Sequence, residues 1–165
     1  ATVTNDDYAK FVKATGHKAP KDWTNGTYPT NKAKYPVINV SYNDAIAYCN
    51  WLSKTDSSAN YRLPTEKEWE QAAGHMPKDA DFNAGENLGL KPVNSYSSTL
   101  SASGAVNMWG NVWEWTSTNR TATTKAIKGG AWDSKRTDCR TEYRDEGRNP
   151  QVAYSNVGFR IVREK

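Results

Sequence analysis

The chain has 165 residues and a slightly basic balance, with 22 Lys and Arg against 18 Asp and Glu and a formal net charge of +4. The two signs are interspersed along the sequence, which predicts an ordinary solvated surface and no nucleic-acid partner. Mean hydropathy is −0.88 and no long apolar run occurs, so we expect neither a transmembrane helix nor membrane insertion. The length suits one domain over residues 1–165, able to bury about 70% of its unfolded surface without metals or disulfides.

Cysteine usage is low, because Cys49 and Cys139 are the only two in the chain. A small secreted domain stapled by disulfides would carry more, so the count favours a reduced setting, cytoplasmic or phage-type. Display on a phage or cell surface as part of a larger protein is the other localisation that we keep open. The sequence opens directly on a helix signal and shows no leader pattern, which predicts a mature or trimmed fragment.

Three helices are predicted from capping chemistry. In each case a hydroxyl residue stands three positions before an acid, at the start of an apolar stretch with helical spacing. The three pairs are Thr4 and Asp7, Ser41 and Asp44, and Thr65 and Glu68. A loop rich in Pro, Gly, Asn and Thr separates the first two helices, over residues 16–36.

The second half of the chain predicts short strands between long loops. Residues 74–104 are mostly Asn, Ser, Gly and Lys with little periodicity, so we expect irregular structure there. Short apolar pieces at residues 112–115, 126–132 and 158–162 predict strands of a small, twisted antiparallel sheet. Helices first and strands later indicate the α+β class, with about three helices and long irregular loops.

Five segments, in order, resemble the formylglycine-generating-enzyme (sulfatase-modifying factor) family. They are TNDDYAKFVKATGH from Thr4, PVINVSYNDAIAYCNWL from Pro36, RLPTEKEWEQAA from Arg62, GNVWEW from Gly110, and KGGAW from Lys128 with NVGFR ending at Arg160. The resemblance implies a C-type-lectin-like fold, and the family's first strand has no counterpart in this sequence. Within these motifs we interpret Arg62 and Arg160 as structural residues that make ion pairs or carbonyl contacts.

The family's copper chemistry requires residues that this chain lacks. In the family, Gly-Gly-Ser is followed after two residues by one Cys and after four more by a second, and the two thiolates bind copper. Soft sulfur ligands suit Cu(I). Here Ala131 replaces the Ser, Ser134 replaces the first Cys, and only Cys139 remains. The resemblance therefore implies a non-catalytic member without copper, and Cys139 would be catalytic only if the protein is an enzyme after all.

Cys139 by itself is a weak candidate for a nucleophile. Arg136 and Arg140 flank it and could lower its pKa, but nearby acidic residues oppose this, and the two histidines lie in distant segments. We interpret it as a semi-buried structural cysteine. Cys49 is interpreted in the same way, as a small apolar residue on its helix.

A calcium site is implied by the resemblance at the GNVWEW segment. In family members the backbone carbonyls and the acid of this loop coordinate Ca²⁺, and hard oxygen ligands suit that ion. The matching positions here are the carbonyls of Trp109, Gly110 and Val112 and the carboxylate of Glu114. The alternative is that Glu114 only caps local amides.

The C-terminal loop carries a dense set of aromatic and charged residues, the side chains that dominate binding hot spots. The same region is the ligand face in related C-type-lectin-like proteins, and it predicts recognition of a protein or a glycan. The candidate ligand-binding residues are Trp132, Asp133, Ser134, Arg136, Asp138, Arg140, Glu142, Tyr143, Arg144, Arg148 and Tyr154. Two alternatives stay open: the same residues form a charge network that holds irregular loops together, or the protein is a divergent oxidase or tailoring enzyme.

Overall fold

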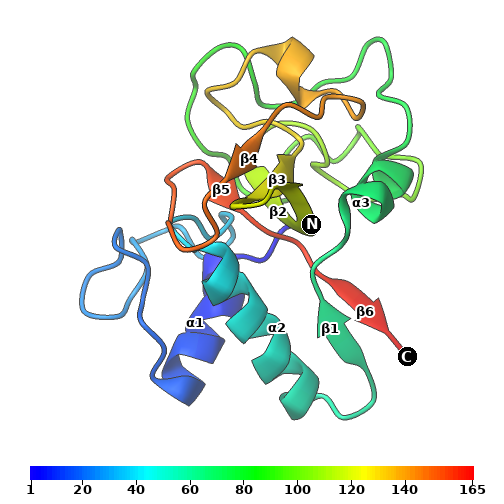
Figure 1. The fold of residues 1–165 in the computed structure, drawn as a ribbon. Helices are drawn as coiled ribbons and strands as arrows, with labels where there is room; N and C mark the ends of the chain where they lie inside the picture. Colours follow the sequence, from blue (N-terminus) through cyan, green and yellow to red (C-terminus); the bar gives the residue numbers. More distant parts are fainter.

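The computed structural model describes all residues from 1 to 165. Its regular elements, in chain order, are α1 (Asn5–Thr15), α2 (Tyr42–Thr55), β1 (Asn60–Arg62), α3 (Glu66–Ala73), β2 (Trp113–Thr121), β3 (Thr124–Lys128), the 3₁₀ helix η1 (Arg136–Cys139), β4 (Gly147–Arg148), β5 (Val157–Gly158) and β6 (Val162–Glu164). Helices α1 and α2 pack together at one end of the molecule, strands β2 to β5 lie in its middle, and many of the loops lie at the other end (Figure 1). The α+β class and the long loops are confirmed.

All three predicted helix starts are confirmed. Thr4, Ser41 and Thr65 are the N-caps of α1, α2 and α3, and each makes both hydrogen bonds of a capping box with the acid three residues later. These reciprocal bonds satisfy amides of the first helical turn that have no partner within the helix. The residues between α3 and β2 contain turns and one isolated bridge, Leu100 with Val106, but no helix or paired strand, as the sequence predicted.

The strands form two sheets, of which the larger has the order β4-β3-β2-β5 and the smaller pairs β1 with β6. Three of the four pairings are antiparallel, but β5 runs parallel to β2, so the expectation of a purely antiparallel sheet was wrong in this one pairing. The parallel pairing arises because the segment between β4 and β5 brings the chain back beside β2, where β5 runs in the same direction as β2.

Two predicted strand boundaries were also wrong. The strand expected at 126–132 ends at Lys128, because Gly129 and Gly130 take φ values of +100° and +71° and turn the chain away. The strand expected at 158–162 is divided between β5 and β6, which belong to different sheets. The short strands β1 and β4 were missed, since two or three residues give no usable period.

The core consists of two clusters of buried side chains. The larger joins α1, α2 and the sheet and contains stacked and edge-on aromatic rings, among them Tyr8, Phe11 and Tyr48. The smaller lies under the loops at the other end, around Trp69, Trp109 and Cys139. Cys49 is buried in the larger cluster as a free thiol, as expected. No helix is both long enough and apolar enough to cross a membrane.

Candidate functional site

The Gly-Gly turn after β3 brings Ala131, Ser134 and Cys139 together. Ser134 closes a tight turn with Ala131: its Oγ accepts the Ala131 N–H at 2.8 Å, and its own N–H donates to the Ala131 carbonyl at 3.0 Å. A Cβ placed on Gly130 would lie 2.2 Å from the Cys139 Sγ, so the thiol packs directly on the glycine backbone. The position where the family has its first cysteine is therefore used here for a backbone hydrogen bond.

Cys139 is sealed from solvent. Its exposed fraction is 0%, and its Sγ makes one weak contact, donating to the Lys135 carbonyl at 3.6 Å. Burial raises the pKa of the thiol to about 12, with Asp138 acting in the same direction and Arg136 opposing it more weakly. The thiol is thus protonated at neutral pH, whereas both nucleophilic attack and copper ligation require the thiolate. One buried thiol and one hydrogen-bonded hydroxyl do not fit a two-sulfur copper site.

Glu114, the carboxylate expected to bind calcium, is fully buried and forms an ion pair with Arg160. Its Oε1 accepts from Arg160 Nε at 2.6 Å and from the Trp69 indole at 2.8 Å, and its Oε2 accepts from Arg160 Nη2 at 3.0 Å. Arg160 also donates to the carbonyls of Val106 and Asn107, which confirms both contacts predicted for it. A calcium ion at this carboxylate would have to compete with the guanidinium.

The GNVWEW segment is therefore chiefly a structural element. The alternative that Glu114 only caps local amides is wrong, because its partners come from α3 and the C-terminal segment. No group of three or more His, Cys, Asp and Glu side chains is placed to hold a metal ion. Calcium at the carbonyls of Trp109, Gly110 and Val112 with the Glu114 carboxylate stays a prediction.

A buried lysine, Lys128, holds loop 132–154 by hydrogen bonds to its backbone. The Lys128 side chain is 0% exposed, and its Nζ donates to Glu70 Oε2 at 2.9 Å and to the carbonyls of Thr141 at 2.8 Å and Tyr143 at 2.6 Å. Arg144 of the loop also binds Glu70, donating from Nε to Oε2 and from Nη2 to Oε1, each at 2.8 Å. Burial lowers the pKa of Lys128 and Glu70 opposes this, while Arg144 and Lys128 hold the pKa of Glu70 near 2.

Several other predicted ligand residues also hold the loop in place. Arg136 lies 3.9 Å above the ring of Phe82 and donates to two backbone carbonyls, and Arg148 pairs with Glu146. The aromatic members Trp132, Tyr143 and Tyr154 pack against the larger core cluster. The charge-network alternative is thus confirmed for Arg144 and Arg148, and Arg136 holds the loop through carbonyls and a ring instead. Nothing in these contacts tests ligand binding.

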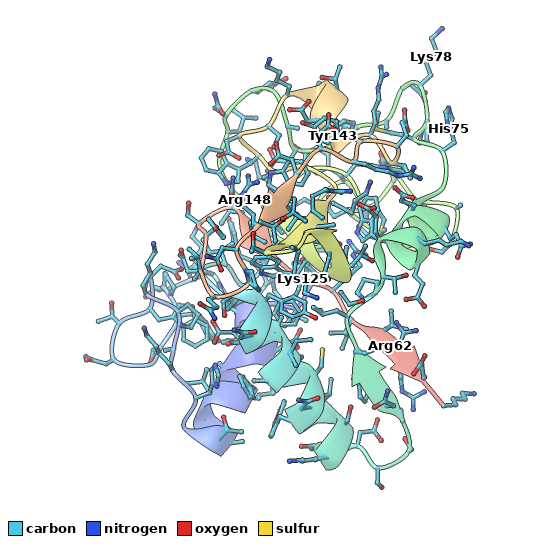
Figure 2. The ribbon with its side chains drawn as sticks, viewed as in Figure 1. Arg62, His75, Lys78, Lys125, Tyr143 and Arg148 are labelled. Carbon is cyan, nitrogen blue, oxygen red and sulfur yellow. The ribbon has the colours of Figure 1, made fainter.

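Among the predicted ligand-binding residues, the charged ones whose side chains do least to hold the loop in place are Asp133, Asp138, Arg140 and Glu142. Arg140 and Glu142 are exposed and line a hollow of about 470 Å³ together with His75, Met76, Pro77 and Lys78, hereafter the recognition hollow. In Figure 2, His75 and Lys78 lie at the outer edge of the loop-rich end. Asp133 contacts Asn156 at 3.3 Å, and Asp138 is half-buried.

Sequence reasoning missed the residues that the segment after α3 contributes to this hollow. His75 and Lys78 stand in a stretch without periodicity, and only the fold brings them to Arg140. Three basic side chains and one acid therefore surround the recognition hollow.

Comparison with known proteins decides the family. The family model described as "Sulfatase-modifying factor enzyme 1-like domain" matches residues 1–165. The chain belongs to this family. Its relatives include the "Inactive C-alpha-formylglycine-generating enzyme 2" of Bos taurus, 32% identical over 163 residues that cover 79% of this chain and 51% of that protein. The "Formylglycine-generating enzyme" of Mus musculus is 31% identical over 177 residues, with 80% and 45% covered.

Solved structures agree on the fold. "Structure of PvdO from Pseudomonas aeruginosa" superposes with a TM-score of 0.83 at 23% identity, covering 99% of this chain and 78% of that one. The C-type-lectin-like "Major Tropism Determinant P3c Variant" gives a TM-score of 0.56 at 13% identity, covering 88% and 42%. The formylglycine-generating-enzyme type of C-type-lectin-like fold is therefore confirmed. The chain spans about half the length of the curated relatives described above.

Proposed function

We propose that this domain is a non-catalytic recognition module that binds a protein or glycan ligand through loop 132–154. The observation that carries the proposal is Cys139, a single buried and protonated thiol at a place where the family's chemistry needs two thiolates. With Ser134 and Ala131 engaged in a turn, the residues left facing solvent can bind but have no activated nucleophile among them.

The recognition hollow is the best candidate for the contact surface. Its position is fixed from below by Lys128 and Glu70, so Arg140 and Glu142 extend from a braced backbone rather than from a free loop. A braced surface loses less conformational entropy on binding. The excess of basic side chains favours an acidic ligand, either an acidic peptide or an anionic glycan, bound at moderate ionic strength.

An array of glycans and peptides probed with the purified domain tests this proposal. We expect binders enriched in acidic members, and Arg140→Ala should weaken binding at least about tenfold because Arg is a frequent hot-spot residue. Lys135→Ala is the matched control, since Lys135 is an exposed basic residue of the same loop outside the hollow. Equal losses in both variants, or no loss in either, would contradict recognition at the hollow.

A divergent oxidase or tailoring enzyme remains the second candidate function. The similarity to a protein named formylglycine-generating enzyme favours it, because both chains share the scaffold. Metal analysis separates the two proposals: stoichiometric copper or iron would support the enzyme, and calcium alone the recognition module. The double variant Ala131→Ser with Ser134→Cys tests whether two substitutions restore copper binding.

A further inference from the structure

The loop between α1 and α2 contains a tight hairpin turn at Asn25 and Gly26. Their φ values are +52° and +73°, and the flanking Thr24 and Thr27 exchange two backbone hydrogen bonds of 3.0 Å each. Two left-handed residues between a bonded pair are typical of a type I′ turn, for which Asn-Gly is the preferred sequence. Figure 1 shows this loop on the α1 side of the molecule, away from α3.

Both residues at the tip of this turn are open to solvent. Asn25 and Gly26 are exposed, and the Gly26 N–H donates to no backbone carbonyl. A Cβ added to Gly26 would meet no atom within 4 Å, so no other segment covers the glycine. The Asn25 side chain and the Gly26 nitrogen are therefore neither shielded nor held by the rest of the fold.

An asparagine that precedes a glycine can lose its side-chain amide without an enzyme. The Gly26 nitrogen gives its proton to hydroxide and forms a bond to the Asn25 Cγ, and the side-chain nitrogen leaves as ammonia. The resulting cyclic imide consumes one water molecule and opens to aspartate or to isoaspartate. In other sequences the Cβ of the following residue crowds the attacking nitrogen, and glycine has no Cβ.

Asn25 is the one asparagine of the chain that precedes a glycine. Asn31 and Asn87 resemble it in other respects, since both are exposed and have φ values of +66° and +53°. The residues that follow them are Lys32 and Leu88. These two asparagines thus match Asn25 in backbone conformation and exposure, and they differ in the residue that supplies the attacking nitrogen.

We propose that Asn25 is a modification site, at which the folded domain deamidates spontaneously. The attack requires the peptide between Asn25 and Gly26 to rotate out of the turn. Two hydrogen bonds and one isolated bridge, between Thr24 and Thr27, are all that closes the turn, and a segment with so few contacts opens at little cost in free energy.

The modification would change both the charge and the backbone of the turn. A new carboxylate adds one negative charge, so the formal net charge of +4 becomes +3. Isoaspartate also adds one carbon to the backbone between Thr24 and Thr27, and the lengthened turn no longer fits their two hydrogen bonds. The site is independent of the recognition hollow, with which the turn shares no residue.

Ageing of the folded domain at pH 9, followed by ion-exchange chromatography and peptide mapping, tests the proposal. We expect an acidic species converted at Asn25, formed at least about tenfold faster than conversion at Asn31 or Asn87, because only Asn25 faces an uncrowded glycine nitrogen. Asn25→Gln should abolish this species, since the longer glutamine side chain would have to close a larger ring. Asn31→Gln is the matched control and should leave its rate unchanged.

The pH dependence and the products identify the reaction. The rate at Asn25 should rise from pH 7 to pH 9, because the attacking nitrogen must lose its proton. Peptide mapping should find both aspartate and isoaspartate, the two products of the imide. An aged domain without the acidic species, earlier conversion at another asparagine, or the same acidic species in Asn25→Gln would each overturn the proposal.

Discussion

Between α1 and α2 the packing centres on aromatic rings, whereas loop 132–154 is held by buried charged groups in addition to an apolar cluster. Tyr8, Phe11 and Tyr48 pack with ring centroids 5.2–5.8 Å apart and gain stability by removing apolar area from water. The loop is held by Lys128, which is buried and bonded to one carboxylate and two carbonyls. A loop with little regular structure thus needs specific polar contacts, because few of its backbone groups are paired within helices or strands.

The largest effect is expected from breaking the ion pair between Glu114 of β2 and Arg160 of the C-terminal segment. Glu114→Ala leaves the Arg160 guanidinium, 11% exposed, without its carboxylate and removes a bond to Trp69. Breaking a buried ion pair from one side costs about 3–5 kcal/mol of unfolding free energy. Urea denaturation measures it, and a loss under about 1 kcal/mol would contradict the structural role assigned to Glu114.

Replacing the buried lysine sharpens the comparison, because its effect should be local. Lys128→Met keeps the aliphatic stem but leaves two loop carbonyls and Glu70 without this donor, which should cost about 2–3 kcal/mol. Amide exchange should accelerate in residues 140–146 and remain unchanged in α1. Lys125→Met, a change at a part-exposed lysine of the same strand, is the control and should have little effect on exchange.

The loop-rich end should also account for a share of acid sensitivity. Arg144 and Lys128 hold the pKa of Glu70 near 2, below its ordinary value, so the carboxylate stabilises the fold above about pH 5 and loses this effect as the pH falls toward 2. Because Arg144 is 61% exposed and screened by solvent, we expect about 1–2 kcal/mol. Stability followed from pH 6 to pH 2 should decline less in Glu70→Gln, and parallel curves would contradict this assignment.

The smallest difference between the two regions should be seen in thiol labelling, because each region contains one buried cysteine. Burial raises the pKa of both Cys49 and Cys139 to about 12. At pH 8 a thiol reagent should therefore react with neither cysteine in the folded protein and with both in urea. Rapid labelling of Cys139 alone under native conditions would contradict the burial of this thiol.

Local chemistry could be predicted from the sequence, and contacts between distant segments could not. Each capping box lies within four residues, so Thr4, Ser41 and Thr65 identified their helices directly. Glu114 and Arg160 are 46 positions apart, so the sequence did not reveal their ion pair, and the family resemblance assigned Glu114 to calcium. Lys128 shows the same limit, since its burial and its bond to Glu70 depend on how α3 packs beside β3.

The recognition hollow was only half predictable for the same reason. The density of Arg and Tyr in loop 132–154 predicted a binding surface, and two of its candidate residues, Arg140 and Glu142, are exposed. Which members of that loop are free to bind depends on Phe82, Glu70 and Glu146, which fasten Arg136, Arg144 and Arg148. No pattern within the loop distinguishes a fastening arginine from a free one.

Copper binding and cysteine oxidation, measured together on the folded domain, test the central claim most directly. The domain would be titrated with Cu(I) against a competing chelator and then incubated with oxygen and a peptide containing one cysteine, with Cys139→Ala measured in parallel. We predict no stoichiometric copper, no aldehyde product by mass spectrometry, and identical behaviour of the variant. One copper per chain that disappears in Cys139→Ala, or conversion of the peptide cysteine to its aldehyde, would contradict the non-catalytic assignment.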